Sequence, residues 1–156
     1  MSSPTQRSLK LMRSEGYVAA VVERYIAAIR KRQDLYGFID LVAMHPSRKG
    51  LVGIQSTTGA NLSSRYKKAL ALGSMFDMWI TCGNTVEFHG WTKKPQKPGS
   101  KRMIWKCRRL YIDENSLRQI RCAEMATGPA TPSQHEPYLQ APTVPNGTEE
   151  AEILVE

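Results

Sequence analysis

Two short apolar segments, each carrying a polar residue, most constrain what this chain can fold into. The first, residues 38–44, contains Asp40, and the second, residues 51–56, contains Gln55. The connection at 45–50 is rich in turn-forming residues, so the two segments are close enough to pair as antiparallel strands. We therefore expect the side chains of Asp40 and Gln55 to lie within reach of each other.

The rest of the pattern predicts strands and helices around this pair. A capped amphipathic helix at 61–72 would allow the chain to cross over to a parallel strand. Residues 24–34 fit a helical turn or a loop equally well. The fold class predicted is α/β, with a mixed central sheet flanked by helices. The other predicted elements are a helix at 4–14, strands at 17–23, 78–81, 85–91 and 103–112, a loop at 92–102, and a short helix at 115–122.

Charge divides the chain into two parts. Residues 1–122 contain all 22 Lys and Arg but only eight acids, a net charge of +14, whereas residues 123–156 contain six acids and no Lys or Arg. The second part is rich in proline and lacks apolar periodicity. We predict one basic domain, 1–122, followed by a disordered acidic tail, 123–156. A domain with this much positive charge favours a polyanionic partner, because binding releases counterions from the polyanion. The alternative is that the charge only keeps the surface soluble.

Several classes of protein are disfavoured by composition. No apolar stretch approaches the roughly 18 residues of a membrane span, and the first residues lack the apolar segment of a secretory signal. The three cysteines show no C-x-x-C spacing, which argues against a disulfide scaffold or a zinc site. We expect a cytoplasmic protein with no membrane partner.

Motif spacing points to a family. The strand Gly37-Phe38-Ile39-Asp40, the triplet Gln55-Ser56-Thr57 and a basic helix after it resemble the PD-(D/E)XK nuclease superfamily. The likeness is closest to its Holliday-junction-resolvase-like and phage-type members, and it spans about residues 8–91. It implies a restriction-endonuclease-like fold, Mg²⁺ or Mn²⁺ as cofactor, and DNA, branched or structured, as partner. A homodimer is a further assembly that it suggests.

The resemblance also implies roles for individual residues. In the family, the strand Asp and the triplet acid hold Mg²⁺, and the triplet Lys orients or activates the attacking water. Asp40 is then the first metal ligand, Gln55 stands where the second acid belongs, and Thr57 stands where the Lys belongs. An amide oxygen at Gln55 can still ligate Mg²⁺, which prefers hard oxygen ligands.

Neighbouring residues are candidates for the missing groups. A second acid is expected from Glu23, taken as a third metal ligand, or from Asp34 or Glu15. The missing cation is expected from Lys68, taken as a catalytic residue, or from Arg65. The DNA contacts are predicted to come from basic residues along the chain: Arg32, Arg65, Lys67, Lys93, Lys94, Lys97 and Lys101.

Simpler interpretations stay open for the same residues. Asp40 could be a strand-end acid paired with Arg32, and Gln55 and Thr57 could do no more than hydrogen-bond the strand end. The predicted function is a nuclease-like DNA-binding protein, in its active form a metal-dependent endonuclease that cleaves phosphodiester bonds. The alternatives are a catalytically inactive nucleic-acid-binding module on the same fold and a basic structural protein without a nucleic-acid role.

The charge of the basic domain generates a prediction about salt. With six to ten phosphate contacts, the affinity for DNA should fall by about 10³–10⁵ between roughly 50 and 200 mM salt. Joint replacement of Lys93, Lys94, Lys97 and Lys101 should weaken binding without unfolding the protein. Fluorescence anisotropy with labelled duplex DNA checks both expectations. Binding that does not depend on salt would contradict them.

Overall fold

The structure is a computed structural model that describes residues 2–126 and 150–153. Its elements alternate along the chain much as the hydrophobic pattern predicts. In order they are α1 (Pro4–Ser14), β1 (Val18–Val21), β2 (Arg24–Ile26), the 3₁₀ turn η1 (Ala27–Ile29), β3 (Lys31–Gln33), β4 (Leu41–Met44), β5 (Val52–Thr58), η2 (Gly59–Asn61), α2 (Leu62–Leu70), α3 (Ser74–Thr81), β6 (Thr85–Pro95), β7 (Met103–Ile112), α4 (Glu114–Ala126) and β8 (Glu150–Ile153).

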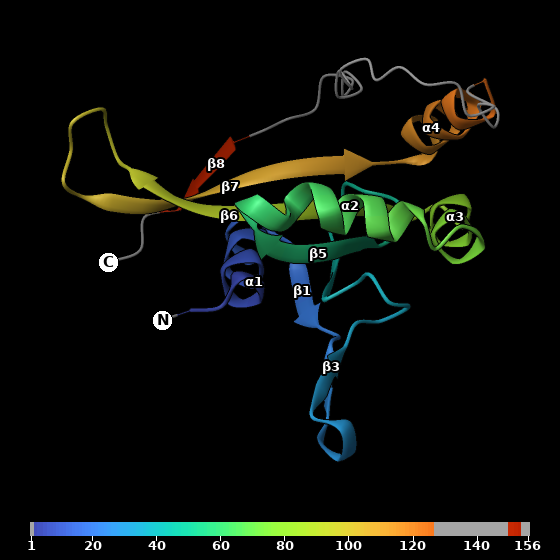
Figure 1. The fold of residues 1–156 in the computed structure, drawn as a ribbon, viewed down its shortest axis with the longest axis horizontal. Coiled ribbons are helices and arrows are strands. Elements are labelled where there is room, and N and C mark those ends of the chain that lie inside the picture. The colour runs from blue at the N-terminus through green and yellow to red at the C-terminus, as the bar shows by residue number, and fades with distance from the viewer. Residues whose placement is uncertain (1, 127–149, 154–156) are drawn as a thin grey trace, which may run out of the picture.

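A mixed sheet forms the centre of the molecule, with strand order β1-β4-β5-β6-β7-β8 (Figure 1). All neighbouring strands are antiparallel except β5 and β6, which are parallel. The chain crosses between those two through α2 and α3, because a parallel neighbour cannot be reached by a tight turn. The predicted α/β class and mixed sheet with flanking helices are confirmed.

Helices cover the two faces of the sheet with two different cores. On one face, α1 places Met12 against Leu41 and Ile54. On the other, α2, α3 and α4 enclose Phe88 of β6 and its neighbours in the larger apolar cluster. Alternation along β5 follows from this arrangement, since successive side chains of a strand point to opposite faces. Gln55 and Thr57 therefore share one face and Ser56 points to the other.

Several predicted elements are confirmed, and one predicted strand is wrong. The helix at 4–14 and the strand at 103–112 have the predicted bounds, and α2 lies within 61–72. The predicted strand at 78–81 is wrong, because these residues form the end of α3. There Phe76 and Ile80, one helical turn apart, are both buried, and this spacing favours a helix over a strand.

The basic loop predicted at 92–102 is shorter than expected. β6 continues to Pro95, so Lys93 and Lys94 lie on a strand, and only residues 96–102 connect it to β7. Figure 1 shows this β6–β7 hairpin extending away from the body of the sheet. The segment 24–34, predicted as a helical turn or a loop, forms a second, short hairpin of β2 and β3 joined by η1.

The predicted boundary between domain and tail also changes. Residues 123–126 continue α4, and residues 150–153 form β8, which pairs antiparallel with β7. These eight residues thus belong to a helix and a strand, which the sequence did not predict for them. The rest of the predicted tail, 127–149 and 154–156, lies outside the described residues. Among the helices of the described residues, none is long and apolar enough to cross a bilayer.

A close backbone approach begins the parallel pair. Gly50 precedes β5 with φ of 73°, and a Cβ there would overlap the carbonyl oxygen of Gly83. The adjacent Leu51 N–H donates to Asn84 Oδ1 at 2.9 Å, and Leu51 O accepts from Thr85 N–H at 2.9 Å. Only glycine fits both the backbone conformation and the space at position 50.

Gly50→Ala should therefore destabilise the fold by roughly 3 kcal/mol, from left-handed backbone strain plus displacement of the 83–85 segment. Gly99→Ala is the matched control, because Gly99 has a similar φ of 79° but open space around it. The control should lose only about 1–2 kcal/mol. Chemical denaturation followed by circular dichroism measures both, and equal losses would refute the role of the close approach.

Candidate metal and nucleic-acid site

Asp40 is held in place by backbone hydrogen bonds to two neighbouring segments. Its N–H donates to the carbonyl of Ile54 on β5 at 2.9 Å. Its own carbonyl accepts from the N–H groups of Val22, at 2.8 Å, and Glu23, at 3.2 Å, just after β1. Asp40 thus lies where β1, β4 and β5 meet, directly before β4 begins.

The side chain of Asp40 is buried, with 4% of its surface exposed. Its Oδ2 accepts from Gln55 Nε2 at 2.8 Å and from the backbone N–H of Ser56 at 2.7 Å. The predicted proximity of Asp40 and Gln55 is confirmed. In this arrangement Gln55 presents its amide nitrogen to Asp40, so it acts as a donor to the carboxylate and holds it in position.

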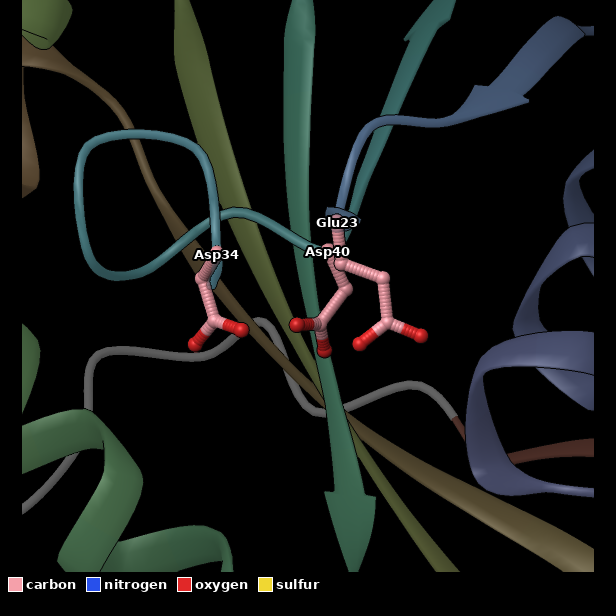
Figure 2. Close-up of side chains that lie close together, drawn as sticks. All are labelled: Glu23, Asp34 and Asp40. Atoms are coloured by element: carbon pink, nitrogen blue, oxygen red, sulfur yellow. The ribbon is translucent and has the colours of Figure 1, made fainter. Parts of the chain in front are cut away.

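Two further carboxylates join Asp40. Ligand oxygens of Glu23, Asp34 and Asp40 all lie within 4.8 Å of one another, and Figure 2 shows the three side chains converging. Glu23 directly precedes β2 and Asp34 directly follows β3. Pairing of Arg24 with Gln33 in the β2–β3 hairpin closes the segment between them, and so brings these two acids together at its base.

Crowding of carboxylates shifts the protonation of the buried one. The pKa of Asp40 is raised to about 7. Burial is the largest cause, because it disfavours the charged form, and Asp34 and Glu23 act in the same direction. The hydrogen bond from the Ser56 N–H acts in the opposite direction. At neutral pH, Asp40 is therefore poised to exchange its proton for another cation.

Two arginines offset part of the negative charge. Arg32 Nη1 lies 2.6 Å from Glu23 Oε1, and Arg65 Nη1 of α2 lies 4.0 Å from Asp34 Oδ2. The alternative in which Arg32 pairs with Asp40 is wrong, because Arg32 contacts Glu23. Of the two cations considered for the site, Arg65 is the one that reaches the acids. Lys68 is exposed and makes no ion pair within the described part of the chain.

The other predicted residues are distributed as follows. Thr57 is buried on the same face of β5 as Gln55, and no hydrogen bond joins it to the three acids within the described residues. Lys67 is exposed on α2. Lys93 and Lys94 are exposed near the end of β6, and Lys97 and Lys101 are exposed in the connection to β7. Glu15 lies elsewhere, paired with Arg109 at 2.7 Å.

Behind Ser56 lies a polar network that sequence reasoning missed. Ser56 Oγ is 2.6 Å from Ser8 Oγ, which is 3.0 Å from His89 Nδ1 and accepts from Trp91 Nε1 at 2.9 Å. His89 and Ser8 are both fully buried. The packing of α1 on β5 and β6 makes this network visible, because Ser8, Ser56 and His89 are each more than 30 positions apart in sequence. It fixes the strand whose Ser56 N–H binds Asp40.

An ionised carboxylate anchors the far end of the network. Glu87 Oε2 lies 3.1 Å from His89 Nε2 and 2.7 Å from Arg109 Nη2, and Glu87 Oε1 lies 3.3 Å from Arg48 Nη1. Burial opposes ionisation of Glu87, but His89 and Arg109 lower its pKa to about 2. Burial lowers the pKa of His89, so the ring is neutral at neutral pH, with Nε2–H donating to Glu87. The network is structural and has no free nucleophile.

Comparisons with known proteins do not identify a relative: no protein-family model, curated protein or solved structure matches this chain.

The raised pKa of Asp40 predicts how stability depends on pH. A carboxyl whose folded-state pKa exceeds its unfolded value binds more protons when folded, so its contribution to stability declines as pH rises from about 4 to about 7. Asp40→Asn imitates the protonated form and keeps an acceptor for Ser56. It should raise the free energy of unfolding at neutral pH by a few kcal/mol, at roughly 1.4 kcal/mol per pKa unit.

Asp113→Asn provides a control of opposite sign. Asp113 accepts from Ser116 at the start of α4, and hydrogen bonding lowers its pKa. Its contribution is present at neutral pH and is lost as pH falls, so this variant should be destabilised at neutral pH. Urea unfolding of both variants across the pH range measures the two slopes. A destabilised Asp40→Asn at neutral pH would contradict the raised pKa.

Proposed function

We propose that this protein is a divalent-metal-dependent endonuclease that acts on DNA, built on a restriction-endonuclease-like fold of the PD-(D/E)XK type. The observation on which the proposal depends is the convergence of Glu23, Asp34 and Asp40 at the junction of three strands. Sequence reasoning finds only one carboxylate in the motif, and the β2–β3 hairpin supplies two more.

The chemistry of these groups fits a hard divalent cation. Mg²⁺ and Mn²⁺ take carboxylate oxygens together with water and phosphate oxygens. Within the described residues, Arg32 and Arg65 contact Glu23 and Asp34 respectively, but no basic side chain contacts Asp40. Exposed acidic groups often gather without a metal, but here one carboxylate is buried and its pKa is raised, so a cation would relieve a real electrostatic cost.

Topology supports the proposed family. Along the chain, α1 and β1 are followed by the β2–β3 hairpin, β4, β5, α2, α3 and β6, with β5 and β6 parallel. This order resembles the predicted helix, three strands, helix and further strands, except that α3 replaces the predicted strand at 78–81. Asp40 directly precedes β4, and Gln55 and Thr57 lie on β5. The contact between Asp40 and Gln55 supports the proposal.

Each residue has a defined task in the proposed reaction. Glu23, Asp34 and Asp40 would hold the metal, which when bound supplies Lewis-acid stabilisation of the phosphate and a lowered pKa for water. Gln55 and the Ser56 N–H orient Asp40 from the interior side. Arg65 cannot replace the family lysine as a proton acceptor, since a guanidinium keeps its proton, but it can bind a phosphate oxygen beside the acids.

A non-catalytic DNA-binding module is the second candidate. The observation that favours it is Thr57, which stands at the lysine position and forms no contact with the acids among the described residues. The basic surface serves both functions equally, so the measurement that separates them is turnover.

Metal binding tests the proposal directly. Titration of Mn²⁺ by calorimetry should give an affinity that rises between about pH 6 and pH 8, because the proton of Asp40 competes with the metal near pH 7. Asp40→Asn should lose at least about tenfold in affinity and abolish nicking of supercoiled plasmid, while DNA binding is retained. Glu114→Gln, which removes an exposed acid paired with Arg118, is the matched control and should behave as wild type.

A gain of function provides the complementary arm of the same test. Gln55→Glu combined with Thr57→Lys should tighten Mn²⁺ binding and raise cleavage, because a further carboxylate and an ammonium join the site. Full cleavage by Asp40→Asn would place the active site elsewhere. Metal binding without cleavage, in wild type and in the double variant, would establish the binding module instead.

A further inference from the structure

A basic arm projects from the acidic cluster. Residues 24–33 form it: β2 and β3 pair antiparallel, with Tyr25 opposite Arg32 and Ile26 opposite Lys31, and η1 makes the tip. Figure 1 shows the arm pointing away from the sheet and its helices. Its cations, Arg24, Arg30, Lys31 and Arg32, are all exposed, and the segment contains no acid.

The composition of the arm argues against a role in the protein core. Tyr25 on β2 is 62% exposed, and neither strand of the arm contains a buried residue. Burial of apolar surface contributes little to the stability of this ribbon. Its exposed positive charge is therefore the property that suggests an anionic binding partner. Four like charges on each arm would also make two arms repel each other, which disfavours pairing between copies of this chain.

We propose that this arm enters the major groove of duplex DNA and so sets the substrate class of the site at its base. The major groove, about 12 Å wide, admits a two-stranded β-ribbon without distortion of the DNA, whereas the undistorted minor groove is only about 6 Å wide. The inference rests on the proposed function, because it deepens the account of what the acidic site acts on.

The length of the arm matches the groove. Three strand residues rise about 10 Å, and the major groove is about 8.5 Å deep. A ribbon that reaches the floor of the groove therefore brings its base to the level of the phosphates at the rim. Glu23 and Asp34 both lie at that base, because Glu23 directly precedes β2 and Asp34 directly follows β3. Asp40 lies beside them. Insertion of the arm thus brings the acidic cluster to the backbone phosphates.

An ion pair links the arm to the cluster. Arg32 of β3 donates to Glu23 at 2.6 Å, and across the ribbon Arg24 donates to Gln33 Oε1 at 3.2 Å. These contacts hold the base of the arm against the acids. The substrate expected from this geometry is double-stranded DNA, including the duplex arms of a branched molecule, in preference to single strands, which have no groove.

Binding without metal tests the inference. The variant Arg24→Gln/Arg30→Gln/Lys31→Gln keeps Arg32 and its contact with Glu23. Its affinity for a duplex in EDTA should fall at least tenfold, and the slope of log affinity against log salt should decrease by about 2–3, at roughly 0.9 per phosphate contact. Single-strand affinity should change much less. Lys10→Gln/Lys49→Gln/Arg118→Gln removes the same charge from exposed positions elsewhere and should keep most of the duplex affinity.

A second probe identifies the groove. A duplex with bulky substituents at pyrimidine C5, which fill the major groove, should bind wild type as weakly as the arm variant binds unmodified duplex. Thermal unfolding should show both variants folded, since all six replaced side chains are exposed.

The outcomes separate the arm from the metal site. Equal losses in the arm variant and its control, or full binding to the C5-modified duplex, would overturn the role of the arm. The metal site would then still stand if Asp40→Asn lowers Mn²⁺ affinity. A failure of Mn²⁺ binding with an arm-dependent duplex preference would refute the nuclease and leave the arm as the DNA contact. Absence of duplex binding by wild type at low salt would refute both the proposed DNA nuclease and the role of the arm.

Discussion

The buried carboxylate of Asp40 is the interaction on which the rest of the site depends. It is bound by the Ser56 N–H and the Gln55 amide from β5, while its own backbone pairs with both β5 and the end of β1. These bonds fix the junction of three strands. A buried carboxyl with two donors on one oxygen keeps the other oxygen for a further partner, and Glu23 and Asp34 crowd that side.

The two faces of the sheet carry different polar groups: a buried hydrogen-bond network on one face and the acidic cluster on the other. Behind β5, the network of Ser8, His89 and Glu87 satisfies buried polar groups and holds the strand from the α1 side. On the opposite face, the acidic cluster contacts α2 through Arg65 and the arm through Arg32. Because Ser56 belongs to both, with its hydroxyl behind and its N–H toward Asp40, the packing of α1 is coupled to the position of the acidic cluster.

Charge is arranged so that neither sign is fully compensated. Arg32 pairs with Glu23, and Arg65 pairs with Asp34. A metal ion would compete with these arginines for the acids, and a phosphate would compete with the acids for the arginines. A divalent cation on the acids would release the two guanidinium groups toward phosphate oxygens. If the acidic cluster binds a metal ion and the arm binds DNA, as proposed, each ligand would therefore favour the binding of the other.

The sequence by itself determined the elements whose pattern is local. The helix at 4–14, the strand at 103–112, the proximity of Asp40 and Gln55 and the excess of positive charge all follow from periodicity, turn residues and composition. Tertiary structure decided what depends on distant residues. The 78–81 segment becomes helix because Phe76 and Ile80 pack into the core, and the third carboxylate appears because a short hairpin closes Asp34 onto Glu23. Contacts between residues that are distant in sequence are set by packing, and spacing along the chain does not predict them.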